Sequence, residues 1–283
     1  MCNHCVIQSV KDRMLNRRTM LKAGLTGAAA LSTGLAPSSN AQAQQQTETP
    51  SVQTQLGNIV DLTHTLSPEF PTYFGAPGIS YEQQFNFKEH GFNLFQLSIN
   101  EHTATHIDAP LHFSADGKSV DEIEPSDLVA PLVVIDIREK ADRDADAQVT
   151  PDDINAWVAK HGPLPEKCCV AMNSGWSAKA GSEADFTGRD ADKGLHFPGF
   201  HVEATTMLLE QSSAVAMAVD TLSLDHGPSS DFATHYAWLP AGRYGIECLA
   251  NLNAVPDAGA TIIVGAPKTK GGTGGPARIF AAA

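Results

Sequence analysis

Residues 102–112 read H-T-A-T-H-I-D-A-P-L-H, and they concentrate the side chains that bind borderline metal ions. Three imidazoles and one carboxylate, from His102, His106, Asp108 and His112, lie within these eleven positions. The whole chain of 283 residues has only 11 histidines, so this density is not typical of a solvated loop. The stretch predicts a metal site, and the fold must bring its side chains together.

A regular strand or helix does not satisfy this requirement. On a straight strand, His102 and His106 would be roughly 13 Å apart, whereas two nitrogens on one ion are at most about 4 Å apart. A helix would bring them closer, but the β-branched Thr103 and Thr105 disfavour one. We therefore expect the backbone to bend sharply or to bulge near Ala104.

The first 43 residues differ in composition from the rest of the chain. Arg17 and Arg18 precede a mildly apolar run at 23–36, and residues 40–43 read N-A-Q-A, which contains an A-x-A cleavage pattern. This segment resembles a twin-arginine export signal. An uncleaved hydrophobic anchor is the alternative, although the run is short for a membrane span.

The segment 1–43 is therefore predicted to be an export signal recognised by the twin-arginine machinery, so the protein is expected to be periplasmic or otherwise exported. Residues 44–56 are polar and predict a flexible linker, and residues 57–283 are predicted to form one domain. Its composition is globular, with 42% hydrophobic and 18% charged residues in the chain. The formal net charge of −13 argues against nucleic-acid binding, which needs clustered Lys and Arg. No membrane span is expected after signal removal.

Hydrophobic patterning from residue 57 onward mixes strands and helices without strict alternation. Helices are predicted at 151–160, where Thr150 is the N-cap and Pro151 the first helical residue, and at 202–211. Strands are predicted at 59–63, 92–100, 132–137, 168–173, 215–219, 260–264 and 277–281. The pattern predicts an α/β fold with a mixed sheet or small barrel and peripheral helices.

Two further features have structural interpretations. Residues 271–275 read G-G-T-G-G but lack the Lys-Ser/Thr of a phosphate-binding loop, so they predict a flexible turn. Cys168 and Cys169 are adjacent and should point to opposite faces of a buried strand. With Cys248 they are interpreted as buried thiols rather than as part of a disulfide framework.

The histidine-rich pattern H-x-A-T-H-x-D-x-P-x-H resembles H-x-G-T-H-x-D-x-P-x-H, the signature of the kynurenine formamidase and cyclase-like family of metal-dependent hydrolases. Every fixed position matches except Ala104, which stands where the motif has Gly. Residues 235–252, which include His235 and the sequence E-C-L-A-N-L, resemble a later family block. Residues 220–225, D-T-L-S-L-D, are similar to a segment of the isatin-hydrolase branch. The resemblance extends over roughly residues 57–281.

This resemblance implies a swivelling β/β/α domain in a homo-oligomer, a dimer or a tetramer, that binds Mn²⁺ or Zn²⁺. It implies that His102, His106 and Asp108 bind a first ion. Asp108 would bridge to a second ion held by His235 and Glu247. Whether one or two ions bind is left open.

The resemblance also suggests roles outside the ligand set. His112 would be the general acid/base. Phe74, in an aromatic loop, would close over a flat substrate, or would simply pack on the core. Trp176 follows a predicted strand and is interpreted either as a substrate contact or as a core residue. Ser223 could hydrogen-bond a product carboxylate, or could satisfy backbone groups.

The sequence thus predicts an exported metal-dependent amidohydrolase, an arylformamidase or cyclic amidase. Isatin-like and N-formylkynurenine-like molecules are the nearest substrate models, and the D-T-L-S-L-D segment favours the former. A lactone or lactam hydrolase of the same family is one alternative. A non-catalytic metal-binding scaffold is another, which the presence of His112 disfavours.

Overall fold

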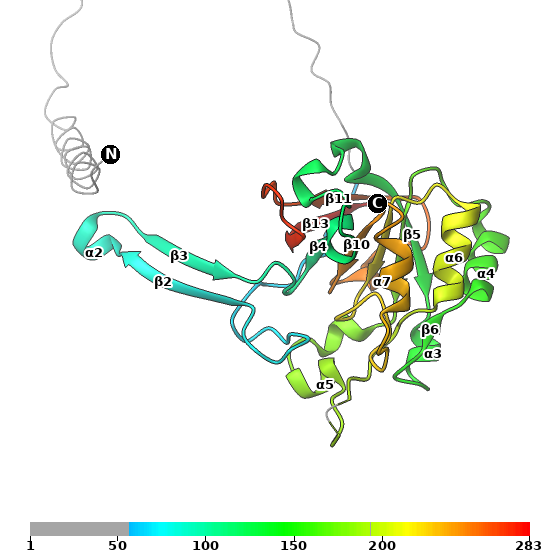
Figure 1. Cartoon of the computed structure of the whole chain (residues 1–283), viewed down its shortest axis with the longest axis horizontal. Coiled ribbons are helices and arrows are strands. Elements are labelled where there is room, and N and C mark those ends of the chain that lie inside the picture. Colours follow the sequence, from blue (N-terminus) through cyan, green and yellow to red (C-terminus); the bar gives the residue numbers. More distant parts are fainter. Residues whose placement is uncertain (1–56, 193) are drawn as a thin grey trace, which may run out of the picture. The chain divides into compact units, whose positions relative to one another are not determined.

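The computed structural model describes residues 57–192 and 194–283 (Figure 1). The predicted export signal and linker, residues 1–56, lie outside the described residues. Within the described part, none of the helices combines the length and the apolar character needed to cross a bilayer. The described residues fall into a main body, residues 57–80 and 98–283, and a separate hairpin unit, Tyr81–Leu97.

The main body is built on a nine-stranded mixed sheet. In spatial order its strands are β1 (Ile59–Asp61), β13 (Arg278–Ala282), β11 (Ala260–Gly265), β5 (Val129–Asp136), β7 (Cys169–Asn173), β9 (Ala216–Val219), β10 (Tyr244–Glu247), β4 (His106–Asp108) and β12 (Gly274–Pro276). The four central strands β5, β7, β9 and β10 are parallel, and the flanking pairs are antiparallel. The predicted α/β class with a mixed sheet is confirmed.

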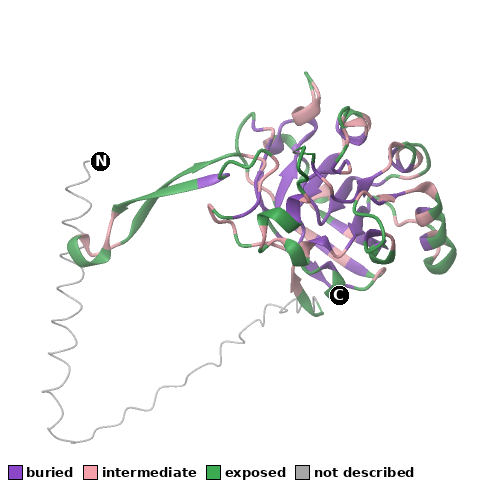
Figure 2. Cartoon of the chain, turned by 90° about the horizontal axis from the view of Figure 1, so that it is seen from below, coloured by how far each residue is buried: buried purple, intermediate pink, exposed green. Residues whose placement is uncertain are grey.

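Both faces of the sheet are covered. The α-helices of the main body are α3 (Arg138–Ala141), α4 (Pro151–His161), α5 (Glu183–Thr187), α6 (Val202–Gln211) and α7 (Ala233–Trp238). Side chains of α4, α6 and α7 pack with Cys168 on one face, whereas Cys169 belongs to the core on the other face. All three cysteines are free and buried, as predicted. Figure 2 shows the buried residues concentrated in the strands.

Short elements complete the fold. They are a two-stranded pairing of β6 (Gln148–Val149) with β8 (Gly199–Phe200), and 3₁₀ turns η1 (Pro110–Phe113), η2 (Val120–Glu122), η3 (Pro125–Asp127), η4 (Trp176–Lys179) and η5 (Leu252–Ala254). The hairpin consists of β2 (Ile79–Phe85), α2 (Phe87–His90) and β3 (Leu94–Ile99). Its strands are mostly exposed (Figure 2).

Local sequence explains the elements that were predicted. Both expected helices and all seven expected strands are present, with ends within three residues of those predicted. In α4, the carboxylate of Asp153 accepts hydrogen bonds from the amide and the hydroxyl of Thr150, each 2.7 Å long. Gly162, with φ of 95°, ends that helix.

The prediction of a flexible turn at residues 271–275 was wrong for the second half of the segment. The first half does form a turn, in which the amide of Gly272 donates to the carbonyl of Thr269 at 3.0 Å. Gly274 to Pro276 form the edge strand β12, which pairs antiparallel with β4. A Cβ atom on Gly274 would lie 2.3 Å from the carbonyl oxygen of Ile107, so this close pairing requires glycine. The low strand propensity of glycine concealed the strand in the sequence.

The buried face of β5 offers a test of the core. Leu132 is 1% exposed and packs in the hydrophobic core on one face of the sheet, whereas Val129 on the same strand is 53% exposed. We expect Leu132→Ala to lower the free energy of unfolding by about 2–5 kcal/mol, because it removes buried methyl groups and leaves a cavity. Val129→Ala should change it by less than about 1 kcal/mol. Urea unfolding of both variants measures the difference, and equal midpoints would contradict this packing.

Candidate metal centre

Strand pairing sets the first part of the site. His106 and Asp108 are two residues apart on β4, so their side chains share one face. In the register between β4 and β10, Glu247 lies opposite His106. As a result His106 Nε2 is 3.3 Å from Asp108 Oδ1 and 3.3 Å from Glu247 Oε2. Gly245, opposite Asp108, has no side chain to fill the space.

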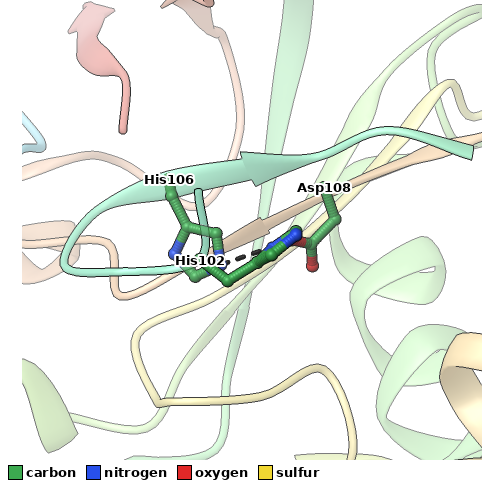
Figure 3. Close-up of side chains that lie close together, drawn as sticks. All are labelled: His102, His106 and Asp108. Atoms are coloured by element: carbon green, nitrogen blue, oxygen red, sulfur yellow. Dashed lines mark hydrogen bonds and ion pairs between the residues drawn. The ribbon is translucent and has the colours of Figure 1, made fainter. Parts of the chain in front are cut away.

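A reversal of the chain brings His102 to the same place. Ala104 has φ of 52°, which confirms the expected bend in the backbone. The bend turns the loop back onto β4, and His102 Nδ1 lies 2.7 Å from Asp108 Oδ1. Figure 3 shows the side chains of His102, His106 and Asp108 pointing toward one another. The 13 Å separation of a straight strand is thereby avoided.

The helix α7 supplies the remaining imidazole. His235 Nε2 is 3.2 Å from Glu247 Oε1 and 3.7 Å from Asp108 Oδ2. Its other ring nitrogen, Nδ1, is 2.6 Å from Oδ2 of Asp225, which also accepts the backbone N–H of His235. The imidazole is thus fixed with Nε2 toward the carboxylates.

The five predicted ligands form two groups that share one residue. Candidate ligand atoms of His102, His106 and Asp108 lie within 4.8 Å of one another, as do those of Asp108, His235 and Glu247. Two buried atoms within this cluster, His106 Nε2 and Asp108 Oδ2, have no hydrogen-bond partner. Burying a polar atom without a hydrogen-bond partner is unfavourable. These residues therefore fit either one cation or two cations that share Asp108 as a ligand.

Comparison with known proteins identifies the family to which the chain belongs. Residues 60–226 match the family model described as putative cyclase. The chain belongs to the cyclase family. It is 31% identical over 241 residues to the isatin hydrolase of Roseibium aggregatum, across 79% of this chain and 90% of that protein.

Two other relatives extend the comparison. The kynurenine formamidase of Salinibacter ruber is 26% identical over 223 residues, across 78% of this chain and 95% of that protein. A crystal structure of an isatin hydrolase bound to the product analogue thioisatinate is 30% identical and has a TM-score of 0.75, with 79% of this chain and 91% of that chain covered. The family resemblance inferred from the histidine-rich motif is confirmed.

Electrostatics in this cyclase-family site favour positive charge. Burial lowers the pKa of His106, but Asp108 and Glu247 outweigh burial and raise that pKa to about 10. Burial also lowers the pKa of His235, which its three carboxylate neighbours nevertheless hold well above the usual value. Burial would raise the pKa of Asp108, but the imidazoles hold it well below its usual range. A metal ion would replace the protons on these imidazoles, so its affinity should fall in acid.

His112 lies next to the cluster but outside both ligand groups. It is carried by η1, and its ring stacks on that of His102 with centroids 3.7 Å apart and planes 20° apart. Burial lowers the pKa of His112 to about 4, although Asp108 opposes the shift. The imidazole is therefore neutral near pH 7 and can accept a proton.

A cavity of about 350 Å³ opens onto the cluster. Its lining includes the four imidazoles and Glu247, together with Tyr73, Phe74, Phe113, Leu222, Ser223, Phe232 and Cys248. Phe74 and Ser223 are thus at the cavity, although Phe74 is 84% exposed. Trp176 is absent from this lining: it is 3% exposed, and its Nε1 donates to the carbonyl of Phe186 at 2.7 Å. The structure therefore supports the core interpretation of Trp176.

Some residues of the site were not identified from sequence. Asp225 was quoted only as part of the D-T-L-S-L-D segment, yet it holds His235. Tyr73, Phe113 and Phe232 are aromatic walls whose positions depend on tertiary structure. An acidic residue ten positions before a predicted histidine ligand could have suggested Asp225, because metal-bound imidazoles usually donate to a carboxylate or carbonyl.

The support of His235 by Asp225 can be tested. Both carboxylate oxygens of Asp225 accept hydrogen bonds, from the amides of Thr234 and His235 and from His235 Nδ1. We expect Asp225→Asn to weaken Mn²⁺ or Zn²⁺ binding by about 10–100-fold, since an amide cannot accept at both positions. Titration calorimetry measures the affinity. The exposed Asp231 provides the control variant Asp231→Asn, and equal affinities in the two variants would reject the role.

Proposed function

We propose that this protein is a metal-dependent hydrolase that opens a small cyclic aryl amide of the isatin type. The observation that carries the proposal is the neutral His112, held beside a buried His/Asp/Glu cluster at an aromatic cavity. The isatin hydrolase relatives support the choice of substrate class. The D-T-L-S-L-D segment, which supplies Leu222 and Ser223 to the cavity, supports it as well.

The ligand set suits a borderline divalent ion. His102, His106 and His235 offer nitrogen, and Asp108 and Glu247 offer oxygen, a mixture that favours Zn²⁺ or Mn²⁺. Such an ion, bound there, would polarise the amide carbonyl and lower the pKa of water. The protein supplies the fixed positions of the donors, because four of the five come from strands or a helix of the main body.

His112 is the residue that we propose transfers the proton. Hydrolysis joins water to the carbonyl carbon and breaks the C–N bond, which yields a carboxylate and an aromatic amine and releases one proton to solvent. The attacking water must lose a proton, and the leaving nitrogen must gain one. A neutral imidazole beside the cavity can accept the first proton and donate it to the nitrogen. The pKa of His112, lowered to about 4 by burial, keeps its base form available.

The cavity walls support a flat, compact substrate. Phe113, Leu222 and Phe232 present apolar surface, and a volume of about 350 Å³ suits a single small ring system. The exposed Phe74 is proposed to contact the bound molecule from the rim, and the buried Ser223 from the cavity wall. Among the described residues, Ser223 Oγ accepts the amide of Asp225 at 3.3 Å and donates to no acceptor, so its hydroxyl proton is available to a carboxylate product.

Hydrolysis of an aryl formamide is the second candidate. The kynurenine formamidase relatives support it, and the same groups would cleave an open-chain amide. A panel of isatin, N-formylkynurenine and an aryl lactone, followed by absorbance with protein loaded with Mn²⁺ or Zn²⁺, separates the possibilities. Ring opening of isatin as the fastest reaction supports the proposal. No turnover by metal-loaded protein would instead leave the non-catalytic metal-binding scaffold.

The role of His112 gives a direct prediction. We expect His112→Ala to lower turnover by about 10²–10⁴-fold, because the proton acceptor is lost. Metal content should be unchanged, since His112 belongs to neither ligand group. Turnover and metal stoichiometry are measured on the same preparation. His161→Ala, at the end of α4, is the control and should retain activity; a His112→Ala variant as active as this control would reject the assignment.

We also propose that the protein is exported, on the evidence of residues 1–43. Replacement of Arg17 and Arg18 together by Lys should keep the precursor unprocessed in the cytoplasm. Cell fractionation with immunoblotting measures this, and a periplasmic double variant would contradict a twin-arginine route. The homo-oligomer, a dimer or tetramer, also remains a prediction, which light scattering can measure.

A further inference from the structure

The glycine-rich segment at residues 271–275 was assigned no function from sequence, yet it lies against a proposed metal ligand. Thr273 Oγ1 is 2.9 Å from His102 Nε2. A Cβ atom on Gly274 would lie 2.8 Å from His102 Cε1, so the backbone lies directly beside the imidazole. The opposite ring nitrogen of His102, Nδ1, faces Asp108. Thr273 therefore touches the side of the ring that points away from the cluster.

Glu101 determines how Thr273 can bond. The hydroxyl of Thr273 donates to Glu101 Oε2 at 2.5 Å, and the backbone N–H of Thr273 points to the same carboxylate at 3.2–3.3 Å. A carboxylate only accepts hydrogen bonds, so the single proton of the threonine hydroxyl is committed to Glu101. Toward His102, the hydroxyl oxygen can then act only as an acceptor. His102 must therefore carry its proton on Nε2.

This assignment has a consequence at the other nitrogen. A neutral imidazole with its proton on Nε2 presents a lone pair at Nδ1, and that atom is 2.7 Å from the acceptor Asp108 Oδ1. Two acceptors at this distance repel unless a proton or a metal ion lies between them. The orientation is the one that a metal ligand requires, and the ring is further confined by the stacked His112.

The segment that carries Thr273 is held at several points. The backbone carbonyl of Thr273 accepts a hydrogen bond from the amide of Ala109, and the carbonyl of Gly272 accepts one from the amide of Val120. The amide of Gly271 donates to Asp121 Oδ1 at 2.9 Å. A Cβ atom on Gly272 would lie 2.7 Å from Glu101 Oε1, so glycine is needed for the carboxylate to approach. These contacts fix the hydroxyl before any ion binds.

We propose that Glu101 and Thr273 are positioning residues that fix the tautomer and orientation of His102 for metal binding. The inference rests on the proposed metal centre and adds the group behind one of its ligands. The relay runs from the Glu101 carboxylate through the Thr273 hydroxyl to His102 Nε2, and it leaves Nδ1 as the ligand atom. Outer hydrogen bonds of this kind raise metal affinity by about 10–100-fold.

Isosteric variants test the relay with Co²⁺ as the probe. Thr273→Val removes the hydroxyl but keeps the shape, and should weaken Co²⁺ binding by about 10–100-fold. Thr273→Ser keeps the hydroxyl and should restore affinity to within a few-fold of the starting protein. Glu101→Gln should weaken binding as well, because its amide can donate to Thr273 and release the hydroxyl proton toward His102. Thr269→Val, exposed in the same loop, is the control.

The measurements are Co²⁺ affinity by competition with a chromophoric chelator, the visible absorption spectrum of the Co²⁺ form, and thermal unfolding of chelator-treated protein. Support requires that Thr273→Val and Glu101→Gln lose affinity and shift the Co²⁺ bands while their metal-free unfolding temperatures stay unchanged. The inference would be overturned if Thr273→Val bound Co²⁺ as tightly as the unaltered protein, or if Thr273→Ser lost as much affinity as Thr273→Val. If Thr273→Val does not fold, the Co²⁺ affinities of Glu101→Gln and Thr273→Ser test the inference instead. Failure of the unaltered protein to bind Co²⁺ would instead reject the metal centre itself.

Discussion

The left-handed backbone conformation of Ala104 is the constraint on which the metal centre depends. A residue with a Cβ atom pays roughly 1–2 kcal/mol to adopt it, and such strain persists only where the surroundings fix it. Here the surroundings do so: Ala104 is 2% exposed, and the hydroxyl of Thr105 donates to the carbonyl of Cys248 and accepts the amide of His64. Without this reversal His102 could not face Asp108, and only the two strand-borne members of the first ligand group, His106 and Asp108, would remain.

The second constraint is electrostatic. Asp108, Glu247 and Asp225 bring three carboxylates into a region where each is less than 10% exposed, and their ion pairs there are with the imidazoles of His102, His106 and His235. Unpaired buried charge is strongly unfavourable, so positive charge must enter with the imidazoles or with an ion. Protons on His106 and His235 satisfy this need in the metal-free protein, as their raised pKa values indicate. The buried carboxylates are thus neutralised either by protons on the imidazoles or by a metal ion, and binding of the ion releases those protons.

Sequence was informative where a signal is local. The bounds of α6, the capping of α4 and the bend at Ala104 follow from neighbouring residues and from the distance that metal ligands allow. Sequence failed where the outcome depends on distant segments. β12 is built mostly of glycine and exists because β4 offers it an edge, and Thr273 meets His102 across 171 positions. Trp176 occupied a plausible place after a strand, but core packing with Phe186 decided its position.

Under the proposed function, the division between sheet and loops separates the metal ligands from the residues that would contact the substrate. His106, Asp108 and Glu247 lie on paired strands, where a shift of one residue would turn every side chain to the other face. Phe74 and Tyr73, by contrast, come from a loop, and Phe232 precedes α7 with φ of 50°. Loops tolerate substitution and insertion far better than paired strands. Under the proposed function, a change of residues at the aromatic wall can therefore change substrate choice while the strands retain the ligand geometry.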